Sequence, residues 1–542
     1  MRKALRGHSW VALLVVPLML ASVASAGEPA TLAADRNAIS ALPQVFEGGL
    51  TVEEYFAEQE ATFAMLDAAM PGDVLARPVR MVVTDEDLAQ LGKSQPGEPL
   101  RIGLVKPLDS AIQVANLGSA VTAKDGRILR QDPVRELDDG MLVWAQAVTA
   151  DGAGGIRLHL QNVSLPDGAE LYFFSAEGEA YGPYSGRGPN GDGDFWTESV
   201  FSSTGVLMLF AATPDILAGA VFAVTEGGCI SPEFTEPLLV GFCGNPDCIE
   251  DASCHNGTPA ASKAIAKMEW IKLPYIYTCT GGLIADNDPA QANYFLTANH
   301  CLSSSNLAKN VTFYWWFATS QCNGTCPSND SWPYKTTGAS VKASNRTGDF
   351  TLMQLYANPP SGAVFLGWTT TPVANSNGTH LYRISNPNFG PQVYSAHDVD
   401  TSSPTCTGWP RGERIYSADV VGATDGGSSG SPVVNGSSQI VGQLSGCCGY
   451  NCGDVCDSAN NWTVDGAFAY YFASVEPYLN PGGCVPVPEV CTDGADNDCD
   501  GFTDCNDSDC SGDPACQCLP KYSPCSSGSQ CCSGKCIRGT CK

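Results

Sequence analysis

The distribution of cysteine most constrains how this chain can fold. All 25 cysteines lie between Cys229 and Cys541, and the first 228 residues contain none. In an exported protein this distribution predicts a disulfide-free unit followed by disulfide-stabilised domains. The odd count leaves one thiol unpaired, or paired only in a precursor.

The first residues predict export. Arg2, Lys3 and Arg6 form a positive region, residues 11–20 form a short apolar run, and residues 24–26 (Ala-Ser-Ala) form a small-residue cleavage signal. We interpret residues 1–26 as a secretory signal peptide, cut before Gly27. A retained membrane helix is disfavoured because the run is too short to span a bilayer, and no later stretch reaches ~18 apolar residues. The mature protein is therefore expected to be secreted and to have no membrane partner.

Length and charge set further limits. A chain of 542 residues exceeds what one hydrophobic core usually serves, so several domains are expected. The formal net charge of −28 argues against a nucleic-acid partner held by phosphate contacts. Acidity by itself says little about the substrate.

Hydrophobic patterns divide the mature chain into four parts. Residues 27–235 begin with helical periodicity over 52–70 and continue as short alternating strands, at 141–148, 155–163, 169–176 and 205–212. Residues 236–480 combine short strands, glycines and cysteines, as expected for an all-β barrel or sandwich. Residues 481–516 form an acidic, cysteine-rich segment, and residues 517–542 form a small module that must be stapled by disulfides.

Three segments of the 236–480 part carry candidate catalytic residues. YFLTANHC (294–301) delivers His300 at the end of an apolar strand, and GDFTLMQL (348–355) places Asp349 at the start of another. GSSGSP (427–432) surrounds Ser429 with glycines. Each segment is weak evidence alone, but their combination and order argue against chance.

The chemistry explains this combination. Serine is a poor nucleophile at neutral pH and needs a neighbouring base, for which histidine has a suitable pKa. A buried carboxylate selects the imidazole tautomer and stabilises the imidazolium. Glycines beside the serine let the backbone amides of Gly427 and Ser429 converge on a developing oxyanion. We therefore predict a triad of His300, Asp349 and Ser429, with Gly427 and Ser429 as the oxyanion hole.

These segments resemble the histidine, aspartate and serine motifs of trypsin-like serine proteases. The resemblance is closer to the bacterial lysyl endopeptidases, over about Gly241 to Leu479. It also includes GFCGNPDC (241–248), CTGGLI (279–284), VTFYWWFATSQC (311–322) and VGQLSG (441–446). It implies a mainly β protein with two six-stranded antiparallel barrels, preceded by a β-rich pro-domain and followed by small disulfide-rich modules. It also implies a bacterial extracellular endopeptidase that is monomeric, acts on proteins or peptides and needs no cofactor for catalysis.

Two departures from the trypsin-like pattern bear on activation and specificity. Ser428 precedes the nucleophile where trypsin-like zymogens carry aspartate, so activation by a new N-terminus is unavailable and a propeptide, residues 27–235, is expected instead. The resemblance implies substrate-binding positions at Ser445, Gly446 and Asp465. The position at which lysyl endopeptidases carry an aspartate is Thr463 here, and Asp465 is the nearest replacement, or else a turn residue. Residues 188–262 contain no Lys or Arg, so self-processing just before Cys243 would not follow a basic residue, and the primary specificity stays open.

The resemblances also imply disulfide pairings. For the protease part they are Cys279–Cys301, Cys248–Cys322 and a bridge from Cys243 to the 447–456 cluster. The last 25 residues resemble a cystine-knot (knottin) framework, which implies Cys518–Cys532, Cys525–Cys536 and Cys531–Cys541. Six cysteines allow 15 pairings, so this assignment depends on the resemblance. The module is either a binding unit or a stable cap.

The acidic segment suggests a metal site. Asp496, Asp498 and Asp500 have the opening spacing of a calcium loop, with Asp507 at its twelfth position in place of glutamate. The segment also resembles the Asp/Cys repeats of proteins secreted by myxobacteria and their relatives. The alternative to calcium binding is an acidic, disulfide-stapled spacer.

Two other functions compete with the protease. One is a catalytically silent trypsin-fold protein that binds or adheres through its cysteine-rich tail, but an intact triad argues against it. The other is a metal-binding exoprotein with cysteine and histidine ligands, and export favours disulfides over zinc.

Overall fold

The structure is a computed structural model. It describes residues 38–481 apart from short internal gaps, and scattered parts of 488–542; the gaps are 93–97, 118–119, 123–127, 131–133, 237–241, 256–258, 289 and 329–333. The fold is mainly β. Among the described residues, no helix has both the length and the apolar character needed to cross a membrane.

The N-terminal part, up to residue 235, is a β-sandwich preceded by a helix. The helix α1 (Val52–Ala69) begins with a capping box between Thr51 and Glu54, which satisfies its first free N–H groups. One sheet has the order β11-β10-β13-β8-β3, with β7 beside β8. Its strands are β3 (Val79–Arg80), β7 (Val134–Glu136), β8 (Leu142–Thr149), β10 (Ala169–Ser175), β11 (Ala180–Tyr184) and β13 (Thr204–Ala211). The helix and the four strands expected from the sequence pattern are confirmed.

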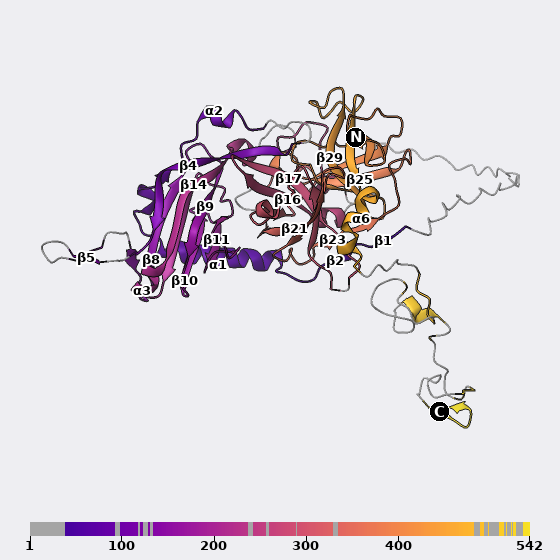
Figure 1. Ribbon diagram of the computed structural model, residues 1–542, viewed down its shortest axis with the longest axis horizontal. Coiled ribbons are helices and arrows are strands. Elements are labelled where there is room, and N and C mark those ends of the chain that lie inside the picture. Colours follow the sequence, from indigo (N-terminus) through magenta and orange to yellow (C-terminus); the bar gives the residue numbers. More distant parts are fainter. Residues whose placement is uncertain are drawn as a thin grey trace, which may run out of the picture. The chain divides into compact units, whose positions relative to one another are not determined.

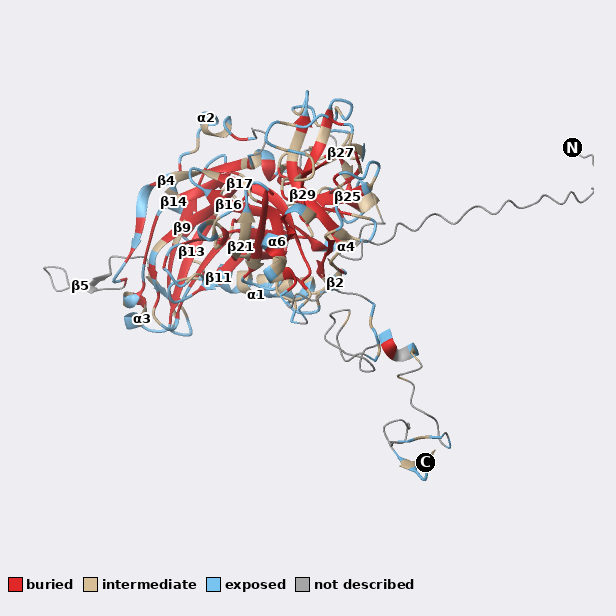
Figure 2. Ribbon diagram, turned by 45° about the vertical axis from the view of Figure 1, so that its right-hand side comes forward, coloured by how far each residue is buried: buried red, intermediate tan, exposed pale blue. Residues whose placement is uncertain are grey.

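The second sheet of the sandwich continues into residues 236–480, the part predicted to be a protease and called the protease part below. Its strands β4 (Leu100–Val114), β9 (Gly155–Ser164), β12 (Phe195–Trp196) and β14 (Val221–Ile230) pair in the order β12-β9-β14-β4. β4 then pairs antiparallel with β17 (Tyr275–Leu283), so residues before 235 and after 236 share one 11-stranded sheet (Figure 1). Buried residues run along β9, β14, β16 and β17 of this sheet (Figure 2).

The residues before the helix also lie on the protease part. β1 (Ser40–Ala41) pairs with β24 (Gly367–Thr369), and β2 (Gln44–Val45) pairs with β23 (Val364–Phe365). Ala41 and Phe46 belong to the same apolar core as the protease strands. The N-terminal part thus packs against the rest both through β4 and through the residues that precede helix α1.

The protease part contains one closed six-stranded barrel and a half-barrel. The closed ring is β25-β26-β27-β30-β29-β28, in which every neighbouring pair is antiparallel. These strands are β25 (His380–Ser385), β26 (Val393–Val399), β27 (Arg414–Val421), β28 (Pro432–Val434), β29 (Gln439–Gly449) and β30 (Asn461–Ala467). Helix α6 (Phe468–Leu479) follows β30 and packs its apolar face on Trp368.

The half-barrel precedes the closed barrel in sequence. Its strands are β16 (Ile265–Lys272), β17, β18 (Tyr294–Ala298), β19 (Thr312–Trp315), β20 (Tyr334–Thr337), β21 (Ala339–Asn345) and β22 (Phe350–Leu355). β20 pairs with β19 and β21 pairs with β22, and Gly338 forms the corner between β20 and β21. Of the two six-stranded barrels expected, one is therefore a complete ring.

The disulfides correct two of the expected pairings. Cys279–Cys301 is present as expected, but Cys248 bonds Cys456 and not Cys322, and Cys243 bonds Cys326 and not the 447–456 cluster. Cys254 takes Cys322. The reason lies in the folded loop, because Asp251 accepts hydrogen bonds from Thr319 and from the backbone N–H of Asn323 and holds Cys254 beside that segment. Cysteine spacing contains no trace of such a contact.

The remaining cysteines concern the unpaired thiol and the disulfides of the tail, whose predicted pairings are confirmed in part. Among the cysteines that the structure describes, Cys229 is the free one; it is buried in β14, and burial raises the pKa of its thiol to about 12. Cys406–Cys448 and Cys447–Cys452 complete the protease part. In the tail, Cys525–Cys536 is present as expected and Cys541 is disulfide-bonded, whereas Cys518, Cys531 and Cys532 lie outside the described residues.

Candidate active site

His300 and Asp349 form a hydrogen-bonded pair between two strand ends. His300 follows β18, and Asp349 immediately precedes the neighbouring strand β22. His300 Nδ1 lies 2.9 Å from Asp349 Oδ2, and the His300 backbone N–H donates to Oδ1 at 3.0 Å. The two side chains are only 11% and 9% exposed. The carboxylate therefore holds both the ring and the backbone of the histidine.

Burial and charge act in opposite directions on Asp349. Burial raises the pKa of this carboxyl, but the attraction of His300 and its two hydrogen bonds outweigh burial, so the pKa lies below the ordinary value. Asp349 has a φ of 53°, and its backbone carbonyl accepts hydrogen bonds from the backbone N–H of Asn299 and from Gln443 Nε2. The carboxylate is held ionised and fixed in place, as a partner for an imidazolium requires.

Gln443 is a contact that sequence reasoning missed. Its side chain donates to the backbone oxygens of Gly348 and Asp349 and accepts from the hydroxyl of Tyr471, whose ring stacks on Phe350 at 4.1 Å. Gln443 belongs to the VGQLSG segment, but nothing in that segment predicts a contact with Asp349. The closed barrel and helix α6 bring the Gln443 side chain to the Asp349 carbonyl.

Ser429 lies in a tight loop packed against β17. The Ser429 carbonyl accepts from the Thr280 N–H at 2.9 Å, and the Gly427 carbonyl accepts from Thr280 Oγ1 at 2.9 Å. Gly430 has a φ of 83°, and an added Cβ would lie 2.6 Å from the Thr280 carbonyl oxygen, so only glycine fits. In the described part of the chain, neither the Gly427 N–H nor the Ser429 N–H donates a hydrogen bond. Both N–H groups are thus without an acceptor among the described residues.

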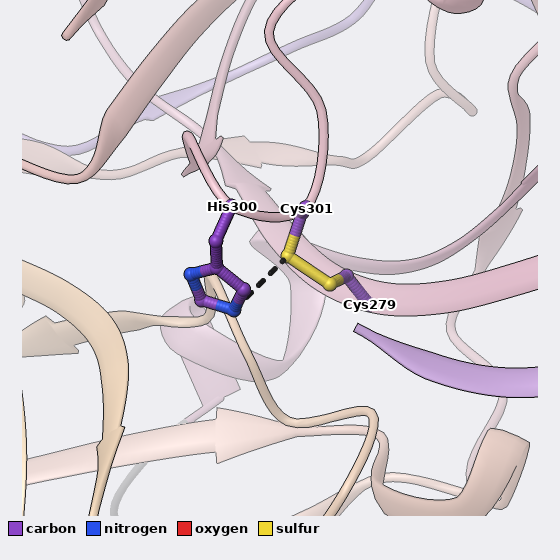
Figure 3. Close-up of side chains that lie close together, drawn as sticks. All are labelled: Cys279, His300 and Cys301. Atoms are coloured by element: carbon purple, nitrogen blue, oxygen red, sulfur yellow. Dashed lines mark hydrogen bonds between the residues drawn. A yellow bond between two sulfur atoms is a disulfide. The ribbon is translucent and has the colours of Figure 1, made fainter. Parts of the chain in front are cut away.

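The Cys279–Cys301 disulfide connects the two halves of this site. Figure 3 shows the His300 ring beside the bridge, with Nε2 3.8 Å from Cys301 Sγ. The same sulfur lies 3.6 Å from the Ser429 carbonyl oxygen. Because both sulfurs are in a disulfide, Cys279, His300 and Cys301 do not form a thiolate metal site.

Ser428 makes only neutral hydrogen bonds at the position where trypsin-like zymogens carry an aspartate. Its buried hydroxyl bonds Ser385 Oγ at 3.0 Å and accepts from the backbone N–H of Asp425 at 3.3 Å. The loop therefore has its own hydrogen bonds at the position where trypsin-like zymogens use an aspartate.

The three predicted substrate-binding residues lie in different surroundings. Gly446 lies in β29, and Trp409 would meet an added Cβ there at 3.5 Å. The buried Ser445 hydroxyl contributes to the lowered pKa of Asp349 but has no hydrogen bond of normal geometry. Asp465 is corrected: it is a fully buried strand residue, and its Oδ1 accepts from Arg383 Nη2 at 2.7 Å. That carboxylate pairs with a buried guanidinium inside the barrel.

Asp419, which the sequence analysis did not single out, is a further acidic residue near the predicted specificity position. It accepts from Thr463 Oγ1 at 2.7 Å, and its Oδ1 lies 2.7 Å from His397 Nδ1. Burial raises the pKa of its carboxyl, but the bond and charge of His397 outweigh burial and lower it. Asp419 therefore lies beside the position at which a lysyl endopeptidase aspartate was expected.

A cavity of about 630 Å³ opens beside the pair. His300, Asp349, Trp409 and Arg414 line one part of it, and Glu98 and Pro99, just before β4, with Arg101 in β4, line another. β4 reaches this place because Leu100 pairs with Thr278, the residue before Cys279. The N-terminal part therefore extends to the histidine itself.

The four aspartates of the predicted calcium loop lie outside the described residues. They are Asp496, Asp498, Asp500 and Asp507. Calcium binding there stays a prediction.

Comparisons with known proteins agree with this geometry. Residues 244–462 match the family model "Lysyl endopeptidase, C-terminal domain", a range that contains His300, Asp349 and Ser429. The chain is 28% identical over 427 residues to the lysyl endopeptidase of Pseudomonas aeruginosa, covering 75% of this chain and 86% of that protein. The chain is thus similar to that lysyl endopeptidase over three quarters of its length.

Other similarities are weaker. Secreted RxLR effector protein 73 of Plasmopara viticola is 26% identical over 56% of this chain and 78% of that protein. Among solved structures, the HtrA-type protease AlgW aligns with 42% of this chain and 64% of its own at 14% identity, with a TM-score of 0.29. The Rv3671c protease of M. tuberculosis aligns with 45% of this chain and 94% of its own at 16% identity, also with a TM-score of 0.29.

Proposed function

We propose that this chain is the precursor of a secreted serine endopeptidase. In this proposal His300 is the general base, Asp349 orients it, Ser429 is the nucleophile and residues 27–235 are the pro-domain. The observation that carries the proposal is the buried His300–Asp349 pair beside a serine loop with two free amides. Homology to lysyl endopeptidase supports the same chemistry.

The reaction follows from these positions. Ser429 Oγ attacks the scissile carbonyl while His300 Nε2 takes its proton, and Asp349 stabilises the resulting imidazolium. The Gly427 and Ser429 N–H groups donate to the oxyanion of the tetrahedral intermediate. His300 returns the proton to the leaving amine, and water then hydrolyses the acyl-enzyme by the same steps.

The pro-domain assignment is supported by its contacts with the protease part. β4 occupies the edge of β17 next to Cys279, and its first residues line the cavity that contains His300. A substrate strand could not pair with an edge that is already occupied. We expect the precursor to be inactive, and removal of residues 27–235 to expose this edge.

Serine-directed labelling tests the proposal. The secreted protein, processed as the cell delivers it, is treated with a fluorophosphonate and with a peptide library whose products are mapped by mass spectrometry. Wild-type protein should be labelled at Ser429 and cleave peptides, and Ser429→Ala should do neither. Ser437→Ala, an exposed serine in a nearby turn, is the matched control and should behave as wild type. Equal cleavage by wild type and Ser429→Ala, or none by either, would favour a silent binding protein.

A further inference from the structure

The peptide bond between Gly426 and Gly427 decides which way the oxyanion amide points. The Asn388 backbone N–H donates to the Gly426 carbonyl at 2.6 Å. In a trans peptide the C=O and the next N–H point in opposite directions. The Gly427 N–H therefore points away from Asn388, and it donates to nothing in the described residues.

The Asn388 side chain fixes the same loop a second time. Its Nδ2 donates to Asp425 Oδ2 at 3.1 Å, and Asp425 Oδ1 accepts from the Gly426 N–H at 2.7 Å. Asn388 has a φ of 53°, which asparagine tolerates better than most residues. Backbone and side chain of one residue thus hold both sides of Gly426.

A second contact leads from Asn388 to the start of the protease part. Asn388 Nδ2 also donates to Asn245 Oδ1 at 3.1 Å. Asn245 in turn donates from its backbone and its side chain to the Phe242 carbonyl, both at 3.0 Å, and the Cys243–Cys326 bridge anchors this segment. Neutral amides and one carboxylate connect these residues.

We propose that Asn388 is a positioning residue for the oxyanion hole and that Asn245 couples it to the first residues of the protease part. This inference rests on the proposed function, since it concerns the amide that would bind the oxyanion. In trypsin-like proteases an aspartate at the position of Ser428 holds the oxyanion loop. In this proposal the side-chain amides of Asn388 and Asn245 hold the loop instead. Asn388 touches no reacting atom, so its effect is transmitted through the Gly426–Gly427 peptide.

The test compares the chemical step with ground-state binding. Asn388→Ala, Asn388→Gly and Asn245→Ala are made in the full chain, and the secreted protein is assayed with the best peptide from the library. Loss of one oxyanion donor typically lowers kcat by about 10²–10³. Because Asn388 acts indirectly, we expect kcat to fall about 10–100-fold in both Asn388 variants, with KM changed less than about threefold. Asn245→Ala should show a smaller loss in the same direction.

A peptide aldehyde supplies a readout that a merely structural role would not change. It forms a tetrahedral adduct, so its Ki should rise by the same factor as kcat falls, while binding of the noncovalent product peptide stays constant. Asn388→Gly tolerates the positive φ and removes only the side chain, which separates strain from hydrogen bonding. Asn451→Ala removes an exposed Asn–Asp hydrogen bond outside the site and is the matched control.

Each outcome supports or refutes one part of the proposal. Wild-type kcat in Asn388→Gly, or equal changes in kcat and KM, would overturn the positioning role while leaving the proposed function intact. If Asn245→Ala has the wild-type kcat while both Asn388 variants are impaired, the coupling through Asn245 is refuted and the positioning role of Asn388 stands. A wild-type protein without Ser429-dependent cleavage would overturn the proposed function and this inference together.

Discussion

Glu269 in β16 is held by residues of the N-terminal part. Its Oε1 lies 2.9 Å from Arg157 Nη1 and 2.7 Å from Ser199 Oγ, and its Oε2 accepts from Tyr314. Both side chains of the Arg157–Glu269 pair are fully buried. Arg157→Met would leave the Glu269 carboxylate without its cation in a dry interior.

The expected cost follows from that geometry. Removing one partner of a buried ion pair typically destabilises by about 3–5 kcal/mol, because the remaining charge is uncompensated. Adding Glu269→Gln removes the charge and keeps an oxygen to accept from Tyr314 or Ser199. We therefore expect the double variant to recover about half of the loss.

Urea unfolding of the precursor measures these energies. Ser429→Ala is used throughout to prevent self-cleavage, and coincident fluorescence and circular dichroism transitions check that unfolding is two-state. Arg80→Met is the matched control, since the Arg80–Asp151 pair has the same kind of contact at 2.7 Å but is 52% and 80% exposed. It should cost less than about 1 kcal/mol. If Arg157→Met costs no more than Arg80→Met, the pair does not hold the two parts together as argued.

Four further outcomes are expected. Gly430→Ala should lower activity at least about 100-fold and reduce Tm, because the site has a positive φ and no space, whereas Gly436→Ala, which has nothing within 4 Å, should leave both unchanged. Cys229 should resist alkylation in the native precursor and react after unfolding, as peptide mapping would show; labelling in the native state would contradict its burial and raised pKa. The lowered pKa of Asp349 means that its contribution to stability is present above the ordinary value of 3.8 and is lost as pH falls through the folded value, so the Tm difference between Ser429→Ala and Ser429→Ala/Asp349→Asn should shrink only below about pH 3.8. Thr463→Asp should raise kcat/KM for lysyl peptides relative to leucyl peptides at least about tenfold, and an unchanged ratio would show that this position does not set the preference.

Local patterns predicted a large part of this molecule. Alternating apolar residues defined the strands at 141–148 and 155–163, and helical spacing defined 52–69, because these signals depend only on neighbouring residues. The candidate residues His300, Asp349 and Ser429 were also found from short segments, each weak alone but specific in combination and order.

Long-range pairing was beyond such patterns. The predicted bridges of Cys243 and Cys248 were wrong: Cys322 pairs with Cys254, which Asp251 holds beside it, so Cys248 bonds Cys456 and Cys243 bonds Cys326. Asp465 was a substrate-binding candidate until the barrel placed Arg383 against it. A carboxylate in a strand looks the same in sequence whether it faces a pocket or a buried arginine.

By itself, therefore, the sequence determined the strands, the disulfide-free first part and the residues that could do acyl-transfer chemistry. Only the tertiary structure decided that β4 joins β17 in one sheet, that Gln443 and Asn388 support the site, and that Asp465 is internal. The physical reason is that local propensity and side-chain chemistry are encoded residue by residue. Contacts between segments depend instead on which surfaces the whole chain buries together.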